Sequence, residues 1–277
     1  MLTLSNKKVM KLNEYLLKHA VLTVEELDQF LSASGPGNPK TRKSLLTYYR
    51  NQGRIVPVRR GLYAVVPLGS ESVSVSVDPY LIAAKLTSDA VLAYHTALEF
   101  HGKAHSVFKQ QHYLSRNKSQ PLVFQSNEFI RAPIPFPLKK KRLEMFGVDA
   151  YSRTGVKVKV TDLERTFVDV MDRPELSGGW EEIWRSLESI EFFDLDQVVE
   201  YVLLLNNATT AAKVGFYLEE HRESLMVEEE YLKPIRDMRP RQPHYLNRSK
   251  RMNCKWIKNW NLLIPTEILN KQWGEVL

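Results

Sequence analysis

One stretch of the sequence combines many cations with a complete absence of carboxylates. Between Pro39 and Arg60 there are seven basic residues and no acidic one. Long cationic side chains bind phosphate oxygens and the acceptor edge of guanine, and Ser, Thr and Asn side chains reach other base edges or the sugar–phosphate backbone. The chemistry that this stretch predicts is non-covalent contact with a nucleic-acid duplex.

The spacing of these residues predicts a helix from Pro39 to Gln52. Asn38 is a helix-capping residue type, Pro39 suits the first helical position, and Gly53 suits the end. At about 100° per residue, an apolar side faces inward and a basic side faces outward. The inward residues are Leu45, Leu46 and Tyr49. The outward residues are Lys40, Lys43, Thr47 and Arg50, flanked by Ser44 and Asn51.

Two short extended segments follow this helix, Arg54–Val58 and Leu62–Val66, and Arg59-Arg60-Gly61 makes the turn between them. A basic hairpin directly after a basic helix is typical of the wing of a winged helix-turn-helix, which we predict for residues 1–67. The alternative is a solvated charged helix followed by an ordinary hairpin. The candidate DNA contacts are Lys40, Thr41, Arg42, Lys43, Ser44, Thr47, Arg50, Asn51, Arg54, Arg59, Arg60 and Tyr63.

Length and charge predict a second domain. A chain of 277 residues is long enough for two domains, and residues 68–77 are a Ser- and Val-rich linker candidate, which leaves 78–277 as the larger domain. Residues 1–77 carry a net charge of +6, residues 78–232 of −6, and residues 233–277 of +7. No apolar run suits a membrane span, no signal peptide is expected, and the single cysteine, Cys254, suits a cytoplasmic protein without disulfides.

The larger domain is predicted to be α+β. Helices are expected over 4–20 and 24–31 in the first domain, and over 79–86 and 90–100 in the second, the last capped by Ser88-Asp89. Residues 107–160 predict a mixed or antiparallel sheet, and residues 180–220 predict three amphipathic helices. Four histidines within residues 95–112 match no metal-site pattern and are expected at helix ends and on the surface. The basic run 139–142 is expected in a solvated loop.

The segment VTDLERTFVDV, residues 160–170, predicts a further helix. Thr161 and Glu164 have the spacing of a capping box, and Glu164, Arg165 and Asp169 have the spacing of ion pairs within a helix. The C-terminal segment 233–258 carries nine basic residues and one acidic residue, with interleaved aromatic residues and prolines. It is either an irregular surface segment packed on the second domain or a surface that contacts polyanions. Residues 260–265 predict a final buried strand.

These motifs together resemble the AbiEi antitoxins of bacterial type IV toxin–antitoxin systems. The resemblance rests on LTVEELDQFL, RRGLYAVVP, VTDLERTFVDVMDRPE and WNLLIP, and it covers nearly the whole chain. It implies a winged helix that represses the protein's own operon by binding operator DNA, and a second domain that counters a nucleotidyltransferase toxin, as in phage defence, without a stable complex. No enzymatic activity and no cofactor is implied. The residues that match the second-domain motif are Thr161, Asp162, Glu164, Arg165, Thr166 and Asp169.

The alternative is a nucleic-acid-processing enzyme, a nuclease or transferase, with an N-terminal DNA-targeting domain. Such an enzyme would need carboxylates to hold Mg²⁺, and Asp149 and Asp169 are the candidates. Ser177-Gly178-Gly179 lacks the lysine and the spacing of a phosphate-binding loop. No GxSxG motif indicates a serine hydrolase.

Overall fold

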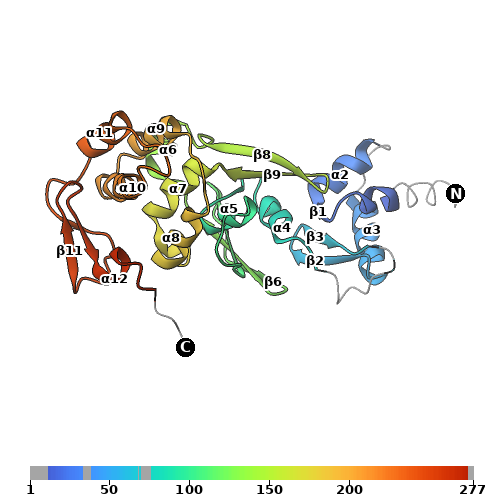
Figure 1. Cartoon of the computed structure of the whole chain (residues 1–277). Coiled ribbons are helices and arrows are strands. Elements are labelled where there is room, and N and C mark those ends of the chain that lie inside the picture. Colours follow the sequence, from blue (N-terminus) through green and yellow to red (C-terminus); the bar gives the residue numbers. More distant parts are fainter. Residues whose placement is uncertain (1–11, 34–38, 68, 70–75, 274–277) are drawn as a thin grey trace, which may run out of the picture.

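The structure is a computed structural model that describes residues 12–33, 39–67, 69 and 76–273. The molecule is elongated, and its fold is α+β, as predicted. The chain runs from helices and a small sheet at one end, through a six-stranded sheet, to helices and a second small sheet at the other end (Figure 1). Of the predicted helix 4–20, residues 12–17 are helical, whereas 4–11 and the predicted cap Asn38 lie outside the described residues.

No helix in the described ranges combines the length and apolar character that crossing a membrane requires.

The N-terminal region combines helices with a three-stranded antiparallel sheet of order β1-β3-β2. Its helices are the helical residues 12–17, α2 (Val24–Ala33) and α3 (Pro39–Asn51), and its strands are β1 (Val21–Thr23), β2 (Ile55–Arg59) and β3 (Leu62–Val65). Strands β2 and β3 form the predicted hairpin. The helices pack over an apolar cluster that includes Leu12, Leu27, Tyr49 and Ile55.

Helix α2 begins with a capping box. The Thr23 backbone N–H donates to the Glu26 carboxylate at 2.9 Å, and the Glu26 N–H donates to the Thr23 hydroxyl at 3.2 Å. These reciprocal bonds satisfy two of the backbone donors that a helix start leaves without partners. The predicted cap of α2 is therefore confirmed.

The middle of the molecule is a mixed sheet of order β6-β7-β5-β4-β9-β8, with the β5–β7 and β4–β9 pairs parallel. Its strands are β4 (Val91–Leu92), β5 (Gln110–Leu114), β6 (Leu122–Phe124), β7 (Asn127–Ala132), β8 (Val148–Arg153) and β9 (Val156–Thr161). Helices α4 (Pro79–Lys85) and α5 (His95–Phe100) pack against it. Asp78 caps α4 by accepting from the Tyr80 N–H at 2.9 Å.

The prediction of a helix over residues 90–100 is wrong for the first half of that range, where the chain forms a strand. Val91 and Leu92 form β4, which lies between β5 and β9, because a fully apolar pair is better buried inside the sheet than at a helix end. Tyr94 has a positive φ of 59°, so α5 starts only at His95. Asp89, the predicted cap, instead accepts hydrogen bonds from Ser115 and Arg116.

Helices dominate the second half of the chain. They are α6 (Phe136–Lys141), α7 (Leu163–Asp172), the 3-10 turn η1 (Pro174–Leu176), α8 (Trp180–Glu188), α9 (Leu195–Leu205), α10 (Ala208–Glu220) and α11 (Glu229–Asp237). Helices α7, α9, α10 and α11 pack together around a large apolar cluster. The basic run 139–142, expected in a loop, ends helix α6, where cations suit the C-terminal end of a helix.

The C-terminal part of the chain forms a small sheet, whereas one of the two predictions for residues 233–258 was an irregular surface segment. Its strands are β10 (His244–Tyr245), β11 (Cys254–Ile257) and β12 (Leu262–Pro265), in the order β10-β12-β11, and α12 (Thr266–Leu269) follows. The predicted buried strand is β12, and Trp260 before it is fully buried against α10. A Cβ at Gly215 of α10 would lie 2.1 Å from the Trp260 ring, so this contact requires glycine.

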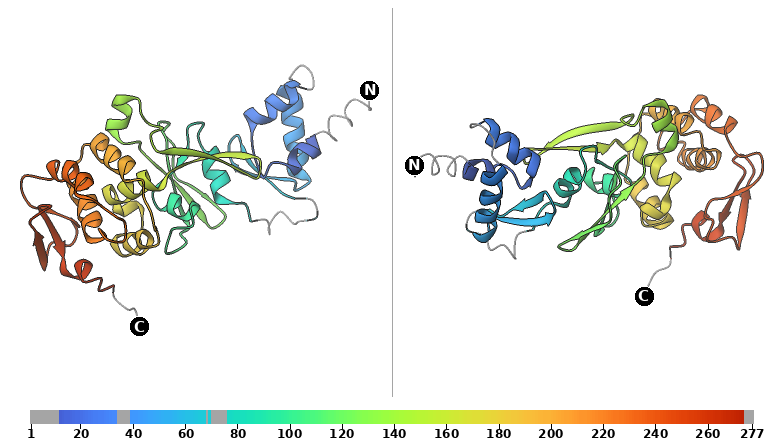
Figure 2. Two further views of the ribbon diagram at one scale, coloured as in Figure 1. Left: turned by 45° about the horizontal axis from the view of Figure 1, so that its top comes forward. Right: turned by 180° about the vertical axis from the view of Figure 1, so that it is seen from behind.

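The N-terminal region and the middle sheet share one apolar cluster. Val58 and Leu62 of the hairpin pack in the same cluster as Leu81 and Ile82 of α4. The β8–β9 hairpin also extends toward the N-terminal helices (Figure 2), and a Cβ at its Gly155 would lie 3.0 Å from the Lys18 carbonyl oxygen. The predicted boundary at 68–77 therefore separates parts that pack together.

Candidate functional site

The outward face of α3 is the first candidate site. Tyr49 is 3% exposed, and Leu45 and Leu46 pack against the N-terminal core, as predicted. The polar residues of the helix point to solvent. The exposed ones are Lys40, Thr41, Lys43, Ser44, Thr47, Arg50 and Asn51. The predicted division of this helix into an apolar and a basic side is therefore confirmed.

Two predicted DNA contacts instead hold the N-terminal region together. Arg42 forms an ion pair with Asp28 of α2. The Arg54 Nε donates to the Val66 carbonyl oxygen at 3.2 Å. Tyr63 is half-buried against the N-terminal core. The sequence indicated a basic run but not that tertiary partners would occupy two of its guanidinium groups.

The tip of the β2–β3 hairpin lies against the middle of the molecule. The Arg59 guanidinium donates to the Leu86 carbonyl oxygen, directly after α4, and to the Ser119 hydroxyl at 3.4 Å. We predicted that Arg59 and Arg60 would both grip a DNA backbone. In the structure Arg59 is engaged within the protein, because Val58 and Leu62 of the hairpin pack in the apolar cluster shared with α4. Arg60 is exposed.

Tyr48 belongs to the exposed face of α3, although we did not predict it. Its side chain is 50% exposed, and its ring meets Tyr49 edge to face at 5.3 Å between centroids. At about 100° per residue Tyr48 follows Ser44 around the helix, so its position was available from the sequence. An exposed aromatic ring beside cations adds a surface for sugar or base contact.

Four residues of the second-domain motif, Thr161, Arg165, Thr166 and Asp169, are buried, and Asp162 and Glu164 are half-buried. Thr161 ends β9, and its hydroxyl bonds to that of Thr166 at 2.7 Å. The predicted capping box at Thr161 is wrong: Asp162 caps α7 by accepting from the Arg165 N–H at 2.7 Å. Glu164 instead accepts from the Asp194 N–H at 3.0 Å, which ties α7 to the start of α9.

Arg165 and Asp169 form the predicted ion pair within α7, with 3.3 Å between Nε and the carboxylate. Both residues are 1% exposed. Arg165 also donates to the carbonyl oxygens of Glu144 and Phe146, at 2.9 and 2.6 Å. The Tyr201 hydroxyl donates to the other Asp169 oxygen at 2.6 Å. This pair therefore fastens the loop before β8 and helix α9 to α7.

The alternative of a nucleic-acid-processing enzyme requires that Asp149 and Asp169 can bind a metal ion. Asp169 is buried, and each of its oxygens accepts a hydrogen bond from the protein, which makes it unsuitable as a metal ligand. Asp149 is exposed on β8. Within the described residues, no group of three or more His, Cys, Asp and Glu side chains has an arrangement that could hold a metal ion.

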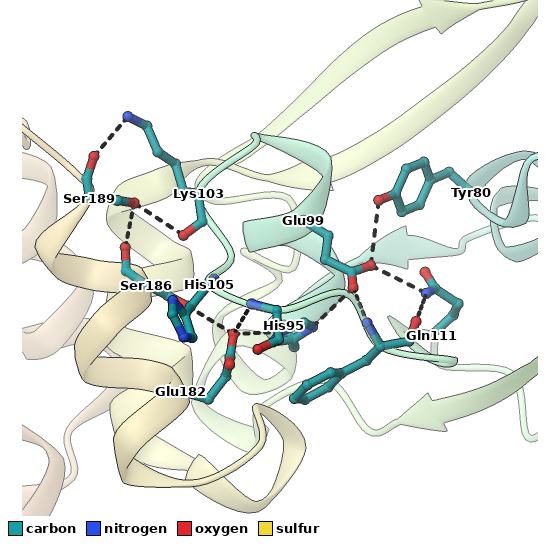
Figure 3. A network of polar contacts seen from close by, with 11 residues as sticks. Tyr80, His95, Glu99, Lys103, His105, Gln111, Glu182, Ser186 and Ser189 are labelled. Carbon is teal, nitrogen blue, oxygen red and sulfur yellow. Dashed lines mark hydrogen bonds and ion pairs between the residues drawn. The ribbon is translucent and has the colours of Figure 1, made fainter. Parts of the chain in front are cut away.

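His95 and His101 lie at the two ends of α5, as predicted, but His95 and His112 are buried rather than on the surface. His95 is fully buried, with Nε2 3.1 Å from the Glu182 carboxylate and Nδ1 3.6 Å from that of Glu99 (Figure 3). Its ring stacks on the Phe108 ring, with 3.8 Å between the ring centroids. Burial lowers the pKa of His112 to about 4, so this histidine is neutral at pH 7.

The His95 network joins α5 and the loop that follows it to the distant helix α8. Glu99 of α5 accepts the Phe108 N–H at 2.5 Å, and Glu182 of α8 accepts the Ser106 N–H at 2.9 Å (Figure 3). Burial opposes ionisation of Glu182, but bonds from Ser106 and His95 bring its pKa below the usual value. These bonds give the network a structural function, because they fix α5 and the following loop against α8.

Comparison with known proteins found a solved structure with a similar fold. No protein-family profile and no curated protein matches the sequence. The structure is similar to the crystal structure of the RV2827C protein from Mycobacterium tuberculosis, with a TM-score of 0.58 and 18% sequence identity. The match covers 92% of this chain and 90% of that protein. The likeness extends over most of both chains and shows a shared fold.

Proposed function

We propose that this protein is a sequence-specific DNA-binding repressor and that α3 is its recognition helix. The observation that carries the proposal is the exposed side of α3, where Lys43, Thr47, Arg50 and Asn51 lie opposite the buried Tyr49. An α-helix fits the major groove, and this combination of cations and hydrogen-bonding side chains can contact both phosphates and base edges.

The hairpin contributes less to this proposal than the sequence suggested. Arg59 is held by Leu86 and Ser119, so Arg60 is the exposed cation of the turn. The proposed winged helix-turn-helix thus docks mainly through α3, with Arg60 as its backbone contact. Tyr48 borders the same surface.

The antitoxin activity is a second part of the proposal and rests on the resemblance to AbiEi proteins. On this proposal the DNA target is the operator of the protein's own operon, and the remainder of the chain counters a nucleotidyltransferase toxin. The burial of Arg165, Thr166 and Asp169 supports a scaffolding role for the TDLERTFVDV segment. The surface that acts against the toxin would then lie elsewhere.

The DNA-binding proposal is tested with the protein's own promoter fragment. We expect Lys43→Ala combined with Arg50→Ala to weaken binding at least tenfold, because this variant lacks two charged hydrogen-bond donors, each of which contributes about 1.5–3 kcal/mol. The slope of log K against log salt should also flatten by about 0.9 for each cation that no longer neutralises a phosphate. Fluorescence anisotropy at several salt concentrations measures both quantities.

The matched control removes the same charge at the other end of the molecule. Arg241→Ala combined with Lys255→Ala changes two exposed cations near the C-terminal sheet, far from α3 (Figure 1). This variant should retain promoter affinity; a loss would instead favour the alternative that the basic segment 233–258 contacts polyanions. Equal affinities for the α3 variant and the unchanged protein would refute α3 as the recognition helix.

A further inference from the structure

A cleft of about 960 Å³ opens at the end of the molecule opposite α3. Its walls come from four segments that are distant in sequence, within 172–181, 207–213, 245–250 and 267–273. They are the turn before α8, the start of α10, the loop after β10 and the chain around α12. The volume matches that of small-molecule sites, which span about 300–1,000 Å³.

Lys213 lines this cleft from α10 although it is only 7% exposed. Its ammonium group donates to the Met171 carbonyl oxygen at 2.9 Å and lies 5.1 Å from the centre of the Trp180 ring. No carboxylate forms an ion pair with it within the described part of the chain. An ammonium has three donors, so Lys213 retains capacity for a ligand.

Arg248 is a second cation that lines the cleft and comes from a different segment, the loop after β10. Its exposed side chain has no hydrogen-bond or ion-pair partner among the described residues. Burial lowers the pKa of Lys213 to about 8; Asp172 and Glu175 oppose this shift, and Arg248 adds to it. Both cations line the same cleft, so an anion bound there would be attracted to each of them.

The carboxylates that line the cleft are already engaged by other groups. Asp172 accepts from Asn207 at 2.9 Å and from Thr210 at 2.5 Å, Glu175 pairs with Arg173 at 3.2 Å, Glu181 pairs with Arg185 at 3.0 Å, and Glu267 pairs with Lys250 at 2.6 Å. Glu175, Glu181 and Glu267 are thus paired with cations, and Asp172 is held by two neutral donors. Lys213 and Arg248 remain for an anionic ligand.

The first turn of α8 supplies backbone donors at the same place, whereas the N–H of Gly179 before it donates to the Pro174 carbonyl oxygen at 3.2 Å. Gly178 and Gly179 have φ values of +76° and +92°, a conformation that favours glycine, and no side chain caps the first turn of α8. A Cβ at Gly178 would lie 2.5 Å from the Phe108 ring, which itself stacks on His95. The network in Figure 3 therefore holds this turn in position.

We propose that the cleft binds a nucleotide, with its phosphate groups between Lys213, Arg248 and the first turn of α8. Uncapped backbone N–H groups at a helix start favour anions, and the two cations neutralise the phosphate charge. Tyr245 and Trp273 also line the cleft, and aromatic rings of this kind stack on bases. No lysine lies next to Gly178 and Gly179 in the sequence, as a phosphate-binding loop would require. In the folded chain Lys213 of α10 lines the same cleft as these two glycines.

Isothermal titration calorimetry of the full-length protein with ADP tests this proposal. We expect ADP to bind, inorganic pyrophosphate to compete with it, and adenosine to compete far more weakly, because the phosphates supply the main contacts. Arg248→Ala should weaken ADP binding about tenfold, and Lys213→Met should weaken it further, since each removes a charge-assisted contact. The control Lys255→Ala, an exposed cation that does not line the cleft, should bind ADP unchanged.

The proposal is overturned if the unchanged protein binds neither ADP nor pyrophosphate, or if both variants bind ADP as well as it does. Arg248 is exposed, so its variant decides the question even if Lys213→Met fails to fold. The site does not depend on the DNA-binding proposal. The Lys43→Ala, Arg50→Ala protein should therefore keep its ADP affinity, and loss of promoter binding alone would leave the cleft proposal intact.

Discussion

At the scale of single residues, charged side chains in this protein serve the interior as well as the surface. Arg165 and Asp169 have the spacing of an ordinary surface ion pair, yet both are buried and bond to other segments of the chain. Removing one partner of such a group is costly because the remaining charge stays buried without compensation. Their contacts with Tyr201 and with the carbonyl oxygens of Glu144 and Phe146 therefore matter for stability.

Replacing Tyr201 with Phe tests this interpretation. The variant lacks the 2.6 Å hydrogen bond to Asp169, and we expect the free energy of unfolding to fall by about 1–3 kcal/mol. The control is Tyr151→Phe, which removes a 3.4 Å hydrogen bond to Asp149 from a residue that is 40% exposed. It should change stability by less than about 0.5 kcal/mol. Urea denaturation measures both, and equal effects would contradict the structural role of the buried network.

At the scale of elements, the fit between α10 and the C-terminal sheet depends on one glycine. Gly215 lies inside α10, where alanine would ordinarily favour the helix by about 1 kcal/mol. A Cβ at this position would lie 2.1 Å from the buried Trp260 ring, so the ring must move. Overpacking of this kind costs about 1–3 kcal/mol, and we expect this cost to exceed the helical gain.

Gly215→Ala is therefore predicted to lower the free energy of unfolding, as measured by urea denaturation. Combining it with Trp260→Phe makes room for the added methyl group. The double variant should lose less stability than the sum of the two single changes. A stabilising effect of Gly215→Ala alone would show that α10 and the C-terminal sheet pack less closely than described.

At the scale of the whole molecule, the N-terminal region is tied to the middle sheet by one ion pair as well as by the shared apolar cluster. The Lys85 ammonium lies 2.7 Å from the Glu26 carboxylate and donates to the Val21 carbonyl oxygen at 2.9 Å. Burial alone would raise the pKa of Glu26, but bonds from Lys85 and Thr23 bring it below its usual value. The carboxylate that caps α2 therefore also anchors α4.

Lys85→Met is predicted to lower the free energy of unfolding by about 1–3 kcal/mol, because Glu26 stays partly buried without its cation. A double-mutant cycle with Glu26→Gln should give a coupling energy of about 1 kcal/mol. The control Lys233→Met breaks a pair with Asp237 in which both side chains are more than 60% exposed. It should cost less than about 0.5 kcal/mol, and a coupling energy near zero at Lys85 would contradict the anchoring role.

The sequence by itself determined the elements whose signals are local. The two sides of α3, the capping box at Thr23 and Glu26, the β2–β3 hairpin and the Arg165–Asp169 pair all depend on residues a few positions apart. Helix periodicity and capping bonds act over this short range, so they can be inferred from spacing. The same signals predicted the α+β class.

Tertiary structure alone decided which of these groups are available to a partner. Arg42 and Arg59 have the same sequence context as Lys43 and Arg60, but Asp28 and the Leu86 carbonyl oxygen occupy them. Val91 and Leu92 became a strand through their neighbours in the sheet, and the cleft around Lys213 is assembled from four distant segments. Partners that meet only in the folded chain determine burial and pairing, and the local sequence carries no record of them.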